Sequence, residues 1–289
     1  MAIPLNPTVT QIVTEGLKRG GRVTPSATDI TNATDNQLRE VKADIMLVCP
    51  TLAALQKTAT AATFVGEQRT AFPADANIPV SLLLLDGPDE YRGTATAGSG
   101  SSISFALTFP VVASTELNGL YILITSGMGI GQYREIRSYV PGTVTATVSP
   151  AWTTNPDNTS VYLVVTRTNY LWDASLPTDI DREPFSLTLG RPIKAARFAE
   201  EFTLYYVPDK VYGLLFRYYI DIDQLDEADT IFVNLLRELR SVWIQGIAVK
   251  TMQRYDEDRY QLELGVYQQM LTYLTVQTTL VSQMQFRDI

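Results

Sequence analysis

Histidine is missing from this 289-residue chain, and cysteine occurs once. Without histidine the chain cannot build a Ser-His-Asp or Cys-His nucleophile, nor any metal site with a histidine ligand. A single cysteine cannot form a disulfide within the chain or a thiolate zinc site, and Cys49 ends the apolar stretch Ile45-Met-Leu-Val, which predicts a buried side chain. These absences exclude many of the common catalytic and metal chemistries.

Long hydrophobic runs and positive charge are also scarce. No stretch approaches the roughly 18 apolar residues of a membrane span, and the first residues lack the basic and apolar regions of a signal peptide. Lys and Arg number 23 against 31 Asp and Glu, a net charge of -8, which argues against a surface built to grip phosphates. We therefore expect a folded protein, made in the cytoplasm, with no membrane segment and no specific binding of nucleic acid.

Both ends of the chain carry helical patterns. A short helix is predicted between Pro7 and Gly20-Gly21, and a second from Ser26 to Pro50, with apolar residues at helical spacing on one face: Leu38, Val41, Ile45 and Val48. Near the other end, residues 231–246 and 264–281 predict two long helices that meet near Arg254–Asp258, where Asp256 or Asp258 caps the second. Residues 52–64 and 80–85 fit neither pattern clearly.

The middle of the chain is β-like. From Asp86 to about Thr168 the sequence is rich in Gly, Ser and Thr, and short alternating runs predict strands at residues 121–125, 133–137, 143–149 and 161–165. Further on, residues 202–207 and 213–222 flank a Pro-Asp turn and predict an aromatic-rich β-hairpin. The predicted fold class is α+β: a helical bundle from both termini plus a β-hairpin, with an inserted antiparallel β-sandwich or barrel domain. The predicted parts are 1–85 (helical), 86–170 (inserted β domain) and 171–289 (hairpin and long helices).

Three groups of residues are candidates for chemistry, and each has a structural interpretation that we favour. Gly127-Met-Gly-Ile-Gly131 lacks the third spaced glycine of a dinucleotide loop and precedes a strand, which indicates a turn. The densest acidic group does not have the spacing of a calcium loop and lies where a helix starts, which favours capping: Asp221, Asp223, Asp226, Glu227 and Asp229. The third group, in a proline-flanked loop, is Asp179, Asp181 and Glu183, and we expect it to be solvated surface. We predict no catalytic residue, metal or cofactor.

Tyrosines are frequent in the predicted hairpin. A stacking platform for sugars or bases is one interpretation, and cross-strand packing is the one we favour for Tyr205, Tyr206, Tyr212, Tyr218 and Tyr219. The apolar stripe of the last helix predicts either core or a subunit interface, and the sequence does not decide between them.

The run from Phe198 to Asp221, followed by an acidic helix start and by Tyr255–Glu263, resembles the head-to-tail adaptor (connector) proteins of tailed bacteriophages. The resemblance implies a structural virion protein without enzymatic activity. It implies a homo-oligomeric ring, usually dodecameric, below the portal, which extends the DNA channel for the passing genome and offers a platform to tail or nozzle proteins. It also implies that the segment Val281–Ile289 docks against the portal, with these anchor residues: Met284, Phe286, Arg287 and Ile289.

Two other functions are open at this point. In the first, the inserted β domain is a binding module of the virion that recognises a glycan or a capsid or tail partner, through Tyr121, Tyr133, Trp152 and Tyr162. In the second, the chain hydrolyses peptidoglycan, with Glu183 as the acid. The sequence offers little support for this hydrolase.

Overall fold

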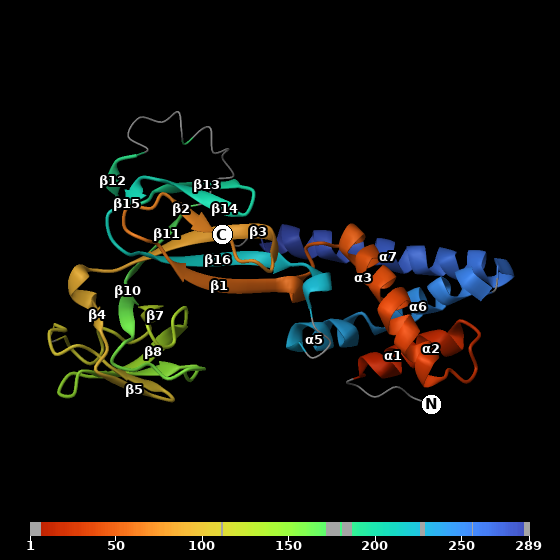
Figure 1. Ribbon diagram of the computed structural model, residues 1–289, viewed down its shortest axis with the longest axis horizontal. Helices are drawn as coiled ribbons and strands as arrows, with labels where there is room; N and C mark the ends of the chain where they lie inside the picture. The colour runs from red at the N-terminus through yellow and green to blue at the C-terminus, as the bar shows by residue number, and fades with distance from the viewer. Residues whose placement is uncertain are drawn as a thin grey trace. The chain divides into compact units, whose positions relative to one another are not determined.

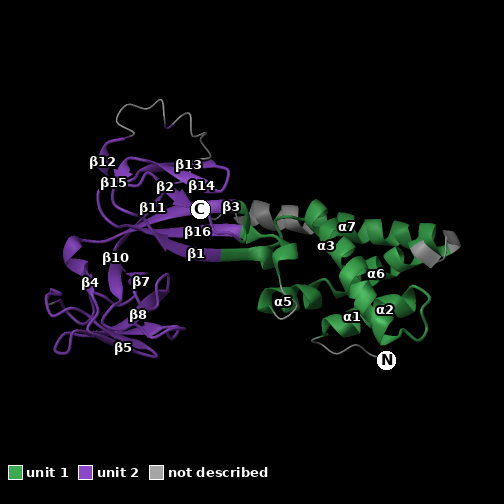
Figure 2. Ribbon diagram, viewed as in Figure 1, with its two compact units in different colours: residues 1–57, 75–78, 219–289 green, residues 58–74, 79–218 purple. Residues whose placement is uncertain are grey.

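The computed structural model describes residues 7–110, 112–171, 180, 187–225, 229–255 and 257–285, with the side chains of residues 254–258 and 277–285 left aside. These residues combine helices with several antiparallel sheets, none of which closes, so the mixed class of fold is confirmed. The chain forms two compact units, one of residues 1–57, 75–78 and 219–289 and the other of residues 58–74 and 79–218 (Figure 2). We call them unit 1 and unit 2.

Unit 1 holds the described helices, which come from the two ends of the chain (Figure 1). The bounds of the N-terminal helices are α1 (Val9–Arg19), α2 (Ala27–Ala33) and α3 (Arg39–Val48), with a π-helical turn (Thr34–Leu38) between the last two. The C-terminal helices are α5 (Thr230–Glu238), α6 (Arg240–Tyr255) and α7 (Glu257–Gln285). Helix α1 packs on α6, and α7 packs on both α3 and α6. None of the described helices has the length and hydropathy that a membrane span requires.

The starts of α1 and α2 follow from local sequence. The side chains of Thr8 and Ser26 each accept a hydrogen bond from the backbone N–H three residues on. In return, the side chains of Gln11 and Asp29 accept a hydrogen bond from the backbone N–H of Thr8 and Ser26. Such reciprocal caps satisfy N–H groups that the first turn of a helix leaves open. The predicted start at Ser26 and the predicted end of the first helix at Gly20 are confirmed.

Close contacts between helices explain the core of unit 1. Leu38, Val41 and Ile45 are buried as predicted, and Cys49 is a buried free thiol. Gly246 of α6 lies so near to α3 and α7 that an added Cβ would be 2.7 Å from Val41 Cγ2 and 3.0 Å from Tyr267 Cε2. A hydrogen in place of a side chain therefore lets three helices meet at one point.

This contact makes a prediction with a built-in control. We expect Gly246→Ala to lower the free energy of unfolding by about 1–3 kcal/mol, because the methyl group overpacks a filled site. Gly265 of α7 has open space around it, so Gly265→Ala is expected to raise the stability by up to ~1 kcal/mol through helix propensity alone. Urea unfolding of the two variants measures both values, and equal effects at the two glycines would contradict the contact.

The predicted long helices need one correction. The first is not continuous, because Leu239 leaves the helical conformation and separates α5 from α6. The second begins at Glu257, within the predicted junction at Arg254–Asp258. Of the predicted caps, Asp256 lies outside the described residues, and Asp258 lies inside the first turn of α7.

Unit 2 contains most of the sheet residues. The strands of a four-stranded sheet lie in the order β1 (Gln56–Ala62), β16 (Gly213–Ile220), β3 (Ala76–Asp86) and β11 (Arg167–Tyr170). A three-stranded sheet has the order β13 (Lys194–Phe198), β14 (Glu201–Tyr205) and β2 (Arg69–Ala71). A short parallel pair joins β12 (Leu189–Gly190) to β15 (Val207–Pro208). Residues 52–64 and 80–85, which the sequence left undecided, thus lie mostly in strands β1 and β3.

The predicted aromatic hairpin is wrong. Strand β14 pairs with β13 and β2, whereas β16 pairs with β1 and β3, so the two aromatic strands belong to different sheets. The hairpin that does form is β13–β14, and its turn holds Ala199 at a φ of 52°. The aromatic residues still pack together. Phe72 meets the rings of Phe202, Phe216 and Tyr218 edge to face, and the rings of Phe202 and Phe216 are tilted against one another.

Residues 92–165 contribute one open sheet of seven antiparallel strands with a core of its own. Their order is β4 (Arg92–Thr94), β10 (Val161–Val165), β7 (Tyr121–Ser126), β8 (Tyr133–Val140), β9 (Thr145–Ser149), β6 (Ser102–Ser104) and β5 (Ala97–Ser99). Among the described strands no pairing joins β4 to β5, so the predicted barrel is wrong and the sandwich stays a prediction. The strand predicted at residues 143–149 starts at Thr145, because Val144 has a φ of 51°. Its alternation is confirmed, with Ala146 and Val148 buried in the core.

Candidate functional site

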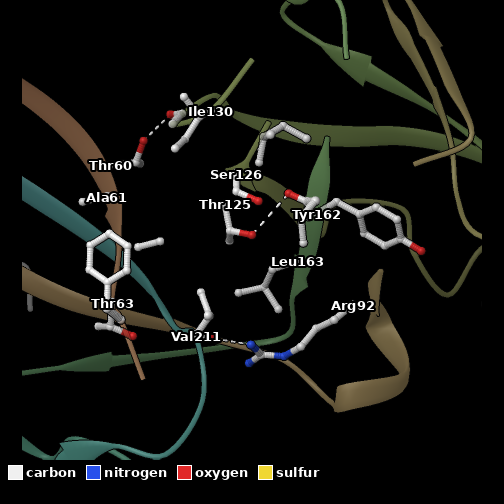
Figure 3. A pocket seen from close by; sticks show the side chains of 15 residues that line it. Thr60, Ala61, Thr63, Arg92, Thr125, Ser126, Ile130, Tyr162, Leu163 and Val211 are labelled. Carbon is white, nitrogen blue, oxygen red and sulfur yellow. Dashed lines mark hydrogen bonds between the residues drawn. The ribbon is translucent and has the colours of Figure 1, made fainter. Parts of the chain in front are cut away.

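Unit 2 contains a cleft of about 580 Å³. One wall is the end of β1 with the residues that follow it, and the other is the seven-stranded sheet at β7 and β10 (Figure 3). The side chain of Arg92 and the chain at Val211 close one end. Most of the lining is apolar, with Ala61, Ala62, Phe64, Ile124, Ile130, Val161, Leu163 and Val211.

The three threonine hydroxyls that line the cleft are already engaged by the protein. Thr60 Oγ1 donates to the carbonyl oxygen of Gly131, and Thr125 Oγ1 donates to that of Val161 at 3.2 Å. Thr63 Oγ1 accepts from the backbone N–H of Tyr212 at 2.9 Å. These hydroxyls hold strands and loops together, and none of them faces a general base. The cleft therefore has the chemistry of an apolar contact site.

The glycine-rich segment at the rim of this cleft is the predicted turn. It joins the antiparallel strands β7 and β8, and Gly127, Gly129 and Gly131 each have a φ near +80°. Three left-handed positions in five residues explain why glycine alternates here. Ile130 and Met128 between them are exposed, as are Phe64 and Val65 on the neighbouring loop. The rim is thus as apolar as the lining.

A cluster of charges lies next to the cleft and was not predicted. Asp86, at the end of β3, is nearly buried. Its carboxylate oxygens lie 2.8 Å from Arg92 Nη2, 3.1 Å from Arg191 Nε and 3.7 Å from Lys210 Nζ. The backbone N–H of Gly87 donates to the same carboxylate at 2.8 Å, and Arg92 also donates to the carbonyl oxygen of Val211. Asp86 therefore ties together three parts of the chain that are distant in sequence: residues 86–92, Arg191 and Lys210.

The surroundings of this cluster change two pKa values. The hydrogen bond from Lys210 to Asp89 holds the pKa of that carboxyl below its usual range. Burial raises the pKa of Tyr212, and its hydrogen bond to Asp209 raises it further. Tyr212 thus stays a neutral donor at ordinary pH, and the cluster has the properties of a structural ion network.

The acidic candidates from the sequence divide between capping and residues outside the described range. Asp221 accepts from the backbone N–H of Asp223 at 2.9 Å at the start of a short helical turn. Asp229 occupies the N-cap position of α5 without a capping hydrogen bond from its side chain, so the capping prediction is confirmed at Asp221 and not at Asp229. The other members lie outside the described residues: Asp226, Glu227, Asp179, Asp181 and Glu183. Among the residues that the structure describes, no three acidic or cysteine side chains gather as a metal site would require.

The hairpin tyrosines are mainly packing residues. Tyr212 and Tyr218 are buried, and Tyr205 packs on Tyr206 with ring centroids 4.6 Å apart. Tyr219 accepts a hydrogen bond from Gln56 through its hydroxyl. Packing is therefore the better interpretation of these rings, although they do not pack across a hairpin.

The aromatic candidates of the β domain divide into two pairs. Trp152 and Tyr162 are buried, with the indole N–H donating to the carbonyl oxygen of Ser102 and the Tyr162 hydroxyl accepting from the N–H of Ala106. Tyr121 and Tyr133 instead stack on one another at 4.8 Å, and Tyr121 is exposed. Burial raises the pKa of Tyr133 to about 12. Of these four rings, Tyr121 is exposed and Tyr133 is partly buried beside it.

The predicted portal anchors lie at the end of the chain. Met284 falls in α7, but its side chain is outside the described part, and so are Phe286, Arg287 and Ile289.

Neither the models of known protein families nor the curated proteins contain a match to this sequence.

Proposed function

We propose that this chain is a structural virion protein, the head-to-tail adaptor of a tailed bacteriophage. Its copies form a ring below the portal, extend the DNA channel and offer a platform to the tail. The proposal rests on the resemblance of residues 198–221 and 255–263 to such adaptors. The proposal also includes a more specific arrangement of the fold, in which helices from both termini form one bundle and the seven-stranded sheet is an inserted domain.

The observation that carries this proposal is the composition of α7. No Asp, Glu, Lys or Arg occurs between Leu264 and Gln285, in a chain of which 19% is charged. Side chains at the centre of a protein–protein interface are depleted of charge in this way, whereas a solvated helix is not. The helix leads directly into the predicted anchors Phe286 and Arg287, so its end is suited to docking on another protein.

The charge of the rest of the chain fits a channel. A net charge of -8 repels the phosphates of passing DNA, which lets the genome slide without specific contacts. The partners in this proposal are the portal, the sister copies and tail or nozzle proteins. The protein is then located in the virion after assembly in the host cytoplasm.

Sizing by light scattering tests the adaptor function. The full chain, mixed with the portal protein of the same phage, is expected to bind in a fixed multiple, and a chain truncated after Thr279 is expected to lose this binding. Phe286→Ala is the finer variant, with Gln285→Ala as its matched control. Absence of binding by the full chain would contradict the proposal, and equal binding by the truncated chain would remove only the anchor segment.

The stacked pair Tyr121 and Tyr133 favours a second candidate function, the binding module of the virion. An exposed ring stacked on its neighbour is a surface on which the apolar face of a sugar packs. Glycan-array binding by the full chain that Tyr121→Ala abolishes would support this function. Trp152→Ala is unsuitable for this test, since Trp152 is buried and its loss would disturb the fold.

A further inference from the structure

The seven-stranded sheet has one face on its own core and a second face that carries Tyr121. Ile122 of β7 and Ile136 of β8 belong to the core. Because side chains alternate between the two faces of a strand, Tyr121 and Glu135 lie on the second face. The register aligns Tyr121 with Glu135 and Glu135 with Ser149, so the three form a row across β7, β8 and β9. In this row the ring of Tyr121 is 40% exposed.

The ring of Tyr121 is held by a neighbour. It stacks on Tyr133 with an interplanar angle of 13° and a centroid distance of 4.8 Å. Tyr133 is partly buried, and it packs on an apolar cluster: Leu85, Leu123, Leu163 and Val165. A ring that is already fixed loses little conformational freedom when a ligand packs on it. Tyr121 is therefore a preorganised flat contact.

Arg217 approaches the aromatic pair from another strand. Leu215 of β16 packs on the same apolar cluster as Tyr133, and Arg217 lies two residues further along the same face of β16. Burial raises the pKa of Tyr133 to about 12, and the guanidinium of Arg217 acts in the opposite direction, as a nearby cation does. The side chain of Arg217 is exposed, and among the described residues none forms a hydrogen bond or an ion pair with it.

The charges around the two rings leave one cation unbalanced. Glu135 is paired with Arg137 at 2.9 Å, so this acid is neutralised, whereas Arg217 has no such partner in the described part of the chain. We call Tyr121, Tyr133, Glu135, Arg137 and Arg217 the tyrosine patch. With two arginines and one glutamate its net charge is +1, in a chain whose net charge is -8. Such a patch attracts an anion, and a guanidinium binds a carboxylate through two parallel hydrogen bonds.

The polar side chains beside the patch favour a sugar over a nucleic acid. Thr147 and Ser149 of β9 lie on the same face as Tyr121, because Ala146 and Val148 belong to the core. Their hydroxyls can donate to and accept from the hydroxyls of a sugar. Single-stranded nucleic acid is bound by several stacked rings in succession and a positively charged groove for its backbone. The row across β7, β8 and β9 offers one exposed ring.

We propose that the tyrosine patch binds a glycan unit that carries a carboxylate, such as a uronic acid. The apolar face of the sugar packs on Tyr121, and its carboxylate accepts two hydrogen bonds from Arg217. The inference rests on the second candidate function, the binding module of the virion, and names the chemical class of its ligand.

A glycan array that pairs each acidic glycan with its carboxyl-reduced form tests this ligand on the full chain. Carboxyl reduction removes the charge and leaves the sugar ring in place. The chain is expected to bind acidic members and to bind their reduced forms at least about tenfold more weakly, the size of one charge-assisted hydrogen bond. Tyr121→Ala is expected to abolish binding of both forms.

Arg217→Gln is the decisive variant. It is expected to weaken binding of the acidic glycans at least about tenfold and to leave the reduced forms unchanged. Arg69→Gln is the matched control, because it removes the same charge from a side chain that is 71% exposed. Arg69 precedes Phe72, which packs on Phe216 of the opposite face of β16, so this control is expected to bind as the unchanged chain does. Equal urea unfolding curves check that the variants fold.

The outcomes separate this inference from the functions on which it does and does not rest. Equal binding of acidic and reduced glycans, still abolished by Tyr121→Ala, would keep the binding module and overturn the carboxylate. Equal losses at Arg217→Gln and Arg69→Gln would also overturn it, since net charge alone would then control binding. The absence of binding to any glycan, or binding of a thymidine oligonucleotide in its place, would contradict both the module and this inference. Portal binding by the adaptor test is independent of all these results.

Discussion

Replacing Asp86 by asparagine is expected to lower the free energy of unfolding by about 3–5 kcal/mol, the usual cost of removing one partner from a buried ion pair. The side chain of Asp86 is only 9% exposed, and it faces Arg92 and Arg191. Without the carboxylate, two guanidinium groups stay in a protein environment with too little negative charge. The amide of asparagine keeps an acceptor for the N–H of Gly87. The decrease in the free energy of unfolding therefore measures the contribution of the negative charge.

Asp89 offers the matched control for this variant. It contacts Arg92 at 3.6 Å and Lys210 at 2.8 Å, but its side chain is 76% exposed. Solvent screens such an ion pair, so Asp89→Asn is expected to lower the free energy of unfolding by less than about 1 kcal/mol. Urea unfolding at neutral pH measures both variants. Similar losses at the two positions would mean that Asp86 is not the centre of the network.

Phe202→Ala is expected to lower the free energy of unfolding by about 3–5 kcal/mol, as much as Asp86→Asn. The ring of Phe202 is buried, and it packs on Phe72 at a centroid distance of 5.5 Å and on Phe216 at 6.0 Å. Phe202 and Phe216 belong to different sheets, so the truncation leaves a cavity between two sheets that rely on this contact.

Phe198 is the control for Phe202, because it lies in the same hairpin and is exposed. Phe198→Ala is expected to change the free energy of unfolding by less than ~0.5 kcal/mol. A large loss at Phe198 would mean that the hairpin itself, rather than the ring cluster, limits stability.

The features that the sequence predicted correctly are local ones. Ser26 and Gly20 act through bonds to residues a few positions away, and the glycine turn at residues 127–131 needs only its own backbone angles. Burial of Cys49 follows from the apolar residues beside it. Such features depend on a short stretch of chain, so a short stretch of sequence predicts them.

The features that the sequence missed depend on pairing between distant segments. The aromatic runs before and after Pro208-Asp209 look like a hairpin because they are adjacent, yet β14 takes partners at residues 69–71 and 194–198. The turn that does form contains Ala199 with a positive φ, and alanine is not a residue type that predicts a left-handed backbone conformation.

The charge cluster shows the same limit for a candidate site. Asp86 precedes Gly87-Pro88 and looks like an ordinary turn residue, and nothing in the sequence connects it to Arg191 or Lys210. The cleft beside it has no motif either, because its hydroxyl groups bond to backbone atoms rather than to each other.

The proposed adaptor function is tested most directly by counting copies of this protein in purified particles of the phage that encodes it, by quantitative mass spectrometry against the portal protein. An adaptor is expected in a fixed ratio to the portal, present in heads that contain a portal and missing from heads assembled without one. Absence from mature particles, or an amount that follows the capsid protein instead of the portal, would contradict the assignment.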